Sequence, residues 1–70
     1  ITRWQQQAMG ANVLAAMGAL AATAGDHAAA VTHYSESLAL KSSVLIRIRL
    51  ARSFLALGDS DNALLHLQAL

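Results

Sequence analysis

Residues 25–34 read GDHAAAVTHY and residues 58–67 read GDSDNALLHL, so a Gly-Asp pair recurs 33 positions later together with an alanine and a histidine. A fixed offset in this range is typical of proteins built from stacked structural repeats. Each pair is also a local signal, because glycine favours the left-handed conformation that ends a helix and aspartate caps the start of the next helix. The stretch therefore predicts two helical hairpins, each turning at a Gly-Asp pair.

The composition favours helices within one small domain. Hydrophobic residues make up 56% of the 70 residues, much of that share is alanine, and proline and cysteine are absent. Alanine has the highest helix propensity, and proline would break a helix. No segment alternates apolar and polar residues as a half-buried strand does. We therefore predict an all-α fold without disulfides or cysteine-bound metal, which is compatible with any cellular compartment.

Residues 4–25 carry no charge, which raises the question of a membrane helix. Such a helix needs about 20 predominantly apolar residues. This segment contains three consecutive glutamines at 5–7, as well as Asn12 and Thr23, and its apolar residues are mainly alanine. We therefore expect no membrane span.

Helical periodicity predicts helices over residues 12–24, 27–40, 44–57 and from residue 60 to the end of the chain. In the third of these we expect one side to be buried, formed by Val44, Ile48, Leu50, Ala51, Phe54 and Leu55. In the fourth we expect an apolar stripe of Leu64, Leu67 and Leu70 that no later helix covers. An uncovered stripe of this kind makes association between copies an expectation for the isolated chain.

The repeat divides the chain into residues 1–10, a first repeat over residues 11–43 and a truncated second repeat over residues 44–70. The chain begins at Ile1 without a methionine, and the apolar helical pattern is still running at Leu70. We therefore expect a piece of a longer repeat protein, in which further repeats would cover the terminal faces.

Residues 1–10 have two possible structures. We expect the tail of a preceding helix, with a turn at residues 10–12 and Trp4 packed on the first hairpin. The alternative is an N-terminal extension of the first predicted helix, since Gly10 inside a helix costs only about 1 kcal/mol. The tail is the expectation because the extension would make that helix longer than is usual in globular proteins.

The two copies share a pattern of alternating large and small residues. The first copy contributes Leu14, Met17, Gly18, Ala21, Gly25, Asp26, Ala30, Tyr34, Ser37 and Leu38, and the second contributes Leu50, Ala51, Phe54, Gly58, Asp59, Ala63, Leu67 and Leu70. This pattern resembles the tetratricopeptide (TPR) repeat, whose usual length is about 34 residues. Two positions depart from the family pattern: Arg47 stands where the second copy should have its first large residue, and Ser42 stands where proline is common.

The physical reason for the pattern is close helix packing. Gly18, Ala30, Ala51 and Ala63 allow helix backbones to approach, while Tyr34 and other large residues fill the remaining space. We therefore expect these four small residues to be buried. A large side chain in one of these positions would overpack the hairpin.

The resemblance implies a TPR-like α-solenoid that binds a protein or peptide partner on its concave face, without catalysis or cofactor. The residues that it places on this face are Asn12, Ala15, Ala19, Ala22, Leu45, Ile48, Arg49, Arg52 and Leu55. The alanines offer no polar clamp, whereas Arg49 and Arg52 are helix neighbours that could pair with one acidic group. The alternative functions are an accessory recruiting arm of a larger enzyme or regulator and a self-associating assembly subunit.

Other chemistries find little support. His33 and His66 occupy equivalent positions, but stacked helices would hold them about 10 Å apart, so we expect solvent-facing histidines and no metal site. Neither Ser35 nor Ser60 has a histidine arranged as in a catalytic triad, and we expect no enzyme. The formal net charge of +1 gives no general attraction to nucleic acid, and we expect none as a partner.

Overall fold

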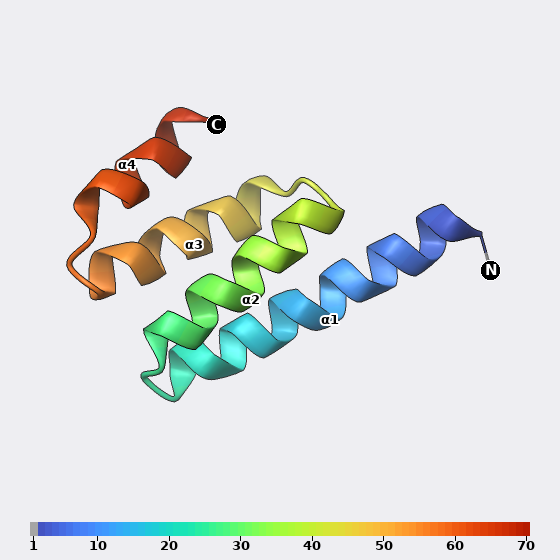
Figure 1. Cartoon of the computed structure of the whole chain (residues 1–70), viewed down its shortest axis with the longest axis horizontal. Helices are drawn as coiled ribbons and strands as arrows, with labels where there is room; N and C mark the ends of the chain where they lie inside the picture. Colours follow the sequence, from blue (N-terminus) through green and yellow to red (C-terminus); the bar gives the residue numbers. More distant parts are fainter. Residues whose placement is uncertain (1) are drawn as a thin grey trace.

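The chain forms four α-helices, and no strand is present in the described part, residues 2–70 of the computed structural model (Figure 1). The helices are α1 (Arg3–Thr23), α2 (His27–Leu40), α3 (Val44–Ala56) and α4 (Ser60–Gln68). Along the chain each helix packs on the next, α1 on α2, α2 on α3 and α3 on α4. The prediction of an all-α fold with two helical hairpins is confirmed.

Both hairpin turns form as the Gly-Asp pairs predict. Gly25 and Gly58 have φ angles of 84° and 79°, in the left-handed region that favours glycine. The carboxylate of Asp26 accepts a hydrogen bond from the backbone N–H of Ala29 at 3.1 Å. The carboxylate of Asp59 accepts one from the N–H of Asn62 at 3.2 Å. The helices α2 and α4 are therefore capped in the same way, at positions 33 residues apart.

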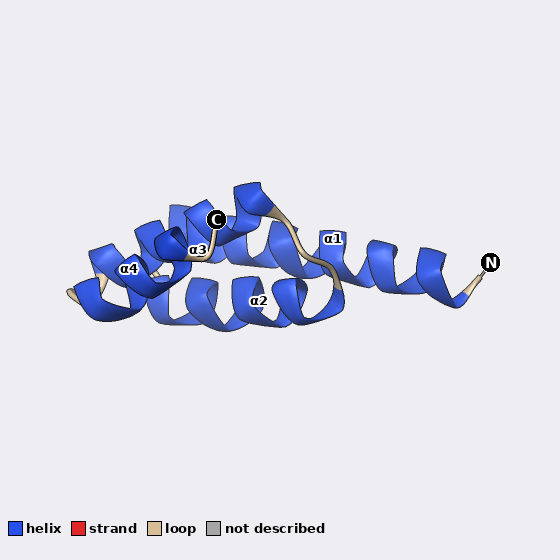
Figure 2. Cartoon of the chain, turned by 90° about the horizontal axis from the view of Figure 1, so that it is seen from above, coloured by secondary structure: helices blue, strands red, loops and turns tan. Residues whose placement is uncertain are grey.

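The expected turn at residues 10–12 is absent, because α1 is one continuous helix of 21 residues. The N-terminal extension is therefore the correct alternative, and the tail of a separate helix is wrong. The physical reason lies at the start of the helix, where Thr2 and Gln5 form a reciprocal capping box. The first turns of α1 project beyond the other helices (Figure 2). Trp4 lies on this projection with 69% of its surface exposed, and the expectation that it packs on the first hairpin is wrong.

The core lies at the α2–α3 contact and is small. Ala30 and Tyr34 of α2 pack with Ile46 and Leu50 of α3. Partly buried apolar residues surround this cluster, namely Ala15, Ala21, Ala22, Val31, Leu38 and Phe54. A core that contains few large side chains predicts marginal stability.

The four small residues of the repeat pattern are buried as predicted: Gly18, Ala30, Ala51 and Ala63. At Gly18 on α1, a methyl group in place of the glycine hydrogen would lie 2.8 Å from two ring carbons of Tyr34. Val44 is 64% exposed, and Ile48 and Leu55 are also exposed, so the expectation that they face the core is wrong for these three residues. They lie on parts of α3 that neither α2 nor α4 covers.

A buried hydrogen bond connects the first hairpin across its two helices. The hydroxyl of Ser37 on α2 donates to the backbone carbonyl of Ala11 on α1 at 2.7 Å. Both residues are buried. The carbonyl lies within the continuous helix α1, so the bond holds the middle of α1 against the C-terminal half of α2.

Candidate functional site

A cleft of about 380 Å³ lies where the first hairpin faces α3. The first hairpin contributes Ala19, Ala22 and Thr23 of α1 and His27 and Tyr34 of α2, while α3 contributes Arg49, Arg52 and Ser53. Alanines in α1 leave the space open, since their side chains do not reach across to α3. The cleft is therefore a consequence of the small residues on the side of α1 that faces α3.

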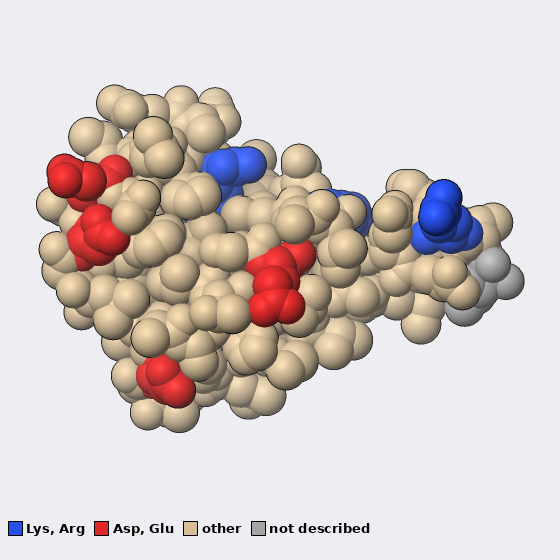
Figure 3. Space-filling model, in the orientation of Figure 1, with Lys and Arg blue, Asp and Glu red and all other residues tan. Residues whose placement is uncertain are grey.

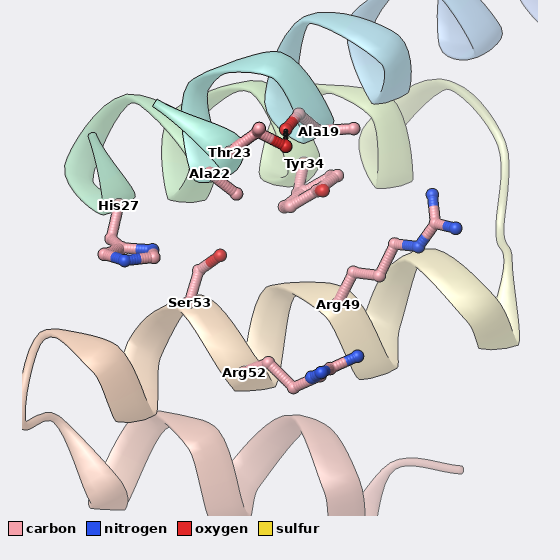
Figure 4. A pocket seen from close by; sticks show the side chains of 8 residues that line it. All are labelled: Ala19, Ala22, Thr23, His27, Tyr34, Arg49, Arg52 and Ser53. Atoms are coloured by element: carbon pink, nitrogen blue, oxygen red, sulfur yellow. Dashed lines mark hydrogen bonds between the residues drawn. The ribbon is translucent and has the colours of Figure 1, made fainter. Parts of the chain in front are cut away.

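The polar groups of the cleft are separated along its length. Figure 4 shows His27 at one end, Ser53 and Tyr34 near the middle and the Arg49 guanidinium at the other end, while the Arg52 side chain runs along α3, on the α4 side in this view. The Thr23 hydroxyl is engaged locally, donating to the carbonyl of Ala19 at 2.9 Å. One end of the cleft is thus basic, and its opposite wall is formed by methyl groups.

The two arginines are available as hydrogen-bond donors. Arg49 and Arg52 are exposed and lie three residues apart on α3, which makes them neighbours on the helix surface. Within residues 2–70, a hydrogen bond engages the guanidinium of Arg47, whereas none engages those of Arg49 and Arg52. Figure 3 shows that, on the face it presents, the acidic side chains lie apart from the lysine and arginine side chains visible there. An anionic group entering the cleft would therefore meet donors that no carboxylate already occupies.

The residues expected on the concave face fall into three sets. Ala19, Ala22, Arg49 and Arg52 come together in the cleft described above. Asn12, Ala15 and Leu45 line a second, smaller cleft of about 230 Å³ at the other end of α3. Ile48 and Leu55 line neither cleft and are exposed on the surface of α3.

The second cleft is bounded largely by the connection between α2 and α3. Its other lining residues include Ser37, Lys41, Ser42, Ser43 and Ile46. Ser43 is the cap of α3, accepting a hydrogen bond from the N–H of Ile46 at 3.3 Å. The two clefts together follow the groove between α1 and α3.

Four lining residues of the larger cleft are not predicted by the sequence, namely Thr23, His27, Tyr34 and Ser53. The sequence holds one signal for two of them, because the tight Gly-Asp turn must bring Thr23 and His27 to the same end of the hairpin. Ser53 is buried, and its place in the cleft depends on how α3 is rotated against the first hairpin. Sequence periodicity does not determine that rotation.

The histidines differ from the expectation of solvent-facing side chains. His66 stacks on Phe54, with ring centroids 5.6 Å apart, and its Nδ1 lies 3.3 Å from a guanidinium nitrogen of Arg47. His33 is half-buried, and its Nδ1 is buried without a hydrogen-bond partner in the described part of the chain. His27 is likewise half-buried, and its Nδ1 is buried without a hydrogen-bond partner among the described residues.

Metal-binding clusters and membrane-spanning helices are both absent from the described residues. No group of three or more His, Asp or Glu side chains among residues 2–70 is arranged to hold a metal ion. In the same part of the chain no helix combines the length and the apolar character that crossing a membrane requires.

Comparisons with known proteins give no assignment. No protein-family model matches the chain, and neither a curated protein nor a solved structure matches it. Its function must therefore be inferred from the geometry of the clefts and from the repeat.

Proposed function

We propose that this chain is a non-catalytic protein-interaction module, in which two TPR-like hairpins hold a partner segment in the groove between α1 and α3. The observation that carries the proposal is the asymmetry of the larger cleft. One wall carries the methyl groups of Ala19 and Ala22, and the other wall is α3 with Arg49, whose guanidinium extends toward the first hairpin, and Arg52. A partner that fits both walls has an apolar side chain beside a carboxylate.

The geometry favours an extended peptide over a bulky ligand. The larger cleft, at about 380 Å³, holds only a few side chains, and the smaller one continues the groove toward the α2–α3 connection. An extended segment can place alternate side chains into successive pockets, which is a common way for proteins to read peptides. Arginine pairs orient a carboxylate by directed hydrogen bonds, while the buried apolar surface contributes most of the affinity.

The test uses an array of synthetic peptides, each with apolar residues flanking one Asp, one Glu or a free terminal carboxylate at varied positions. The tightest binder is then measured by fluorescence anisotropy against the wild type, Arg49→Glu, Arg52→Glu and the control Arg3→Glu. Arg3 is exposed at the start of α1, away from the cleft, so its reversal changes the net charge equally. We expect at least about a tenfold loss for Arg49→Glu and Arg52→Glu, corresponding to about 1.4 kcal/mol, and no change for Arg3→Glu.

Salt dependence separates a specific contact from general charge attraction. The loss caused by Arg52→Glu should be larger at about 0.02 M salt than at about 0.3 M, where screening shortens the range of the charges. Ile48→Asp addresses the wider concave face, because Ile48 is expected there from the repeat but lines neither cleft. Equal affinity of the wild type, Arg49→Glu and Arg52→Glu for the selected peptide would refute binding in this cleft. A loss with Ile48→Asp alone would move the site to the surface of α3 outside the two clefts.

A further inference from the structure

Two apolar faces lie at opposite edges of the helix stack. Figure 1 shows the helices in chain order, with α1 at one edge and α4 at the other. On α1, Met17 is 43% exposed and Val13 is also exposed. On α4, Leu64 is 54% exposed and Leu67 is exposed beside it.

The interface between α2 and α3 shows how such faces pair in this protein. Tyr34 of α2 packs with Ile46 and Leu50 of α3, and Val31 and Phe54 are packed against the same cluster. Leu50 is fully buried there and Tyr34 nearly so. This contact joins the last helix of one hairpin to the first helix of the next.

The 33-residue offset places the same kinds of side chain on the two open edges. On α4, Leu64 and Leu67 occupy the positions that Val31 and Tyr34 occupy on α2. On α1, the positions of Ile46 and Leu50 are held by Val13 and Met17, whereas Ala21, at the position of Phe54, is partly buried against the core of its own molecule. The exposed face of α4 therefore corresponds to the buried face of α2, and the exposed face of α1 corresponds to the buried face of α3.

We propose that the α4 face of one molecule docks on the α1 face of a second copy of this chain, repeating the α2–α3 interface between molecules. For the 70-residue chain the occupant is a second copy, because the interface is already built within the chain and each edge carries one half of it. Charge does not oppose the contact, since α1 has no charged residue between Trp4 and Thr23.

Such an interface is heterologous, because it joins two different surfaces. Each added molecule leaves one α1 face and one α4 face open, so assembly continues head to tail rather than stopping at a dimer. The contact consists of a few side chains, and association should therefore be weak, on the order of 0.1 mM.

Sedimentation velocity of the 70-residue chain from about 5 µM to about 1 mM measures this assembly, a range that brackets the expected affinity. The variants are Met17→Glu on the α1 face and Leu64→Glu on the α4 face. Leu65→Glu is the matched control, because Leu65 is exposed but corresponds to Thr32, an exposed residue on the outer side of α2. All three positions are exposed, so circular dichroism should show wild-type helix content in each variant.

We expect the wild type and Leu65→Glu to grow beyond a dimer with concentration, and each face variant alone to stay monomeric. A mixture of Met17→Glu and Leu64→Glu should form dimers in a 1:1 ratio and nothing larger, because only one intact α4 face and one intact α1 face remain. A wild type that is monomeric throughout would overturn the proposal. So would association that only one of the two face substitutions abolishes, or a mixture that stays monomeric.

Discussion

Replacing Gly18 by alanine should destabilise the protein, although the same change normally strengthens a helix. Gly18 lies inside α1, where alanine gains about 1 kcal/mol over glycine from helix propensity. The added methyl group, however, would lie 2.8 Å from Cδ1 and Cε1 of Tyr34 and 3.1 Å from Cγ. The ring is nearly fully buried in the core cluster and has little room to move away. Forcing a methyl group into such a site costs about 1 to 3 kcal/mol.

The net effect follows from the two contributions. Because the ring is confined, the overpacking cost should lie in the upper part of this range, and we expect Gly18→Ala to lose about 1 to 2 kcal/mol of unfolding free energy. For a domain of this size, each kcal/mol corresponds to about 4 to 8 °C in the melting temperature. Urea unfolding followed by circular dichroism measures the loss, at a protein concentration low enough to prevent association.

The second hairpin supplies a compensating variant. At the positions of Gly18 and Tyr34 it has Ala51 and Leu67, so the residue with the extra methyl group is paired with a smaller side chain. In a Tyr34→Leu background, Gly18→Ala should therefore become neutral or stabilising by up to about 1 kcal/mol, because the overpacking is relieved and the helix gain remains. Gly10→Ala is the matched control in the same helix, since its methyl group would meet only Leu40 Cδ1, at 3.4 Å. If Gly18→Ala in the wild type stabilised the protein as much as Gly10→Ala does, the close contact with Tyr34 would be refuted.

Two further predictions concern hydrogen bonds. Ser37→Ala removes the buried bond to the carbonyl of Ala11 and should cost about 1 kcal/mol in urea unfolding, whereas the exposed Ser35→Ala should have no effect; equal stability of the two variants would contradict this role. The second prediction concerns acid. The Asn62 side chain, and then its backbone N–H, donate to Asp59 and hold the pKa of that carboxyl below its usual value of 3.8. A lowered pKa in the folded state means that the cap stabilises α4 above pH 3.8 and that this contribution is lost as the pH falls through the lowered pKa. An NMR titration of the Asp59 carboxyl should show the lowered pKa in the wild type and a higher one in Asn62→Ala, and an unchanged value would refute the cause.

The sequence predicts those parts of the fold that depend on local chemistry and on the repeat. The Gly-Asp pairs determine both hairpin turns, because glycine must adopt a positive φ there and aspartate caps the following helix. The small residues of the pattern are buried, since they lie where helices touch. The prediction of a turn at residues 10–12 is wrong, because Gly10 does not interrupt the helix and the capping box of Thr2 and Gln5 starts it upstream. The spacing of Thr2 and Gln5 in the sequence is a signal for this capping box.

The exposure of individual side chains and the lining of the larger cleft depend instead on which helices pack beside them. Trp4 and Val44 are apolar at positions that fit a helical stripe, yet no other helix covers them, so they are exposed. The cleft combines residues from three helices, and its lining follows from the rotation of α3 against the first hairpin. Periodicity correctly places Arg49 and Arg52 on one side of α3, but it cannot show that His27 and Ser53 line the same cleft.

The anomalous Arg47 of the repeat pattern has a structural explanation in its neighbour. The guanidinium of Arg47 lies 3.3 Å from Nδ1 of His66, and the His66 ring stacks on Phe54. In the first hairpin the corresponding residues on α1 are Leu14 and Ala21, and the equivalent His33 has a buried Nδ1 without a partner among the described residues. An arginine at this position thus gives the histidine Nδ1 a hydrogen-bond partner, which a leucine cannot provide. This hydrogen bond compensates for the loss of a large apolar residue. Because Arg47 is engaged between α3 and α4, only Arg49 and Arg52 of the three α3 arginines can serve a ligand in the cleft.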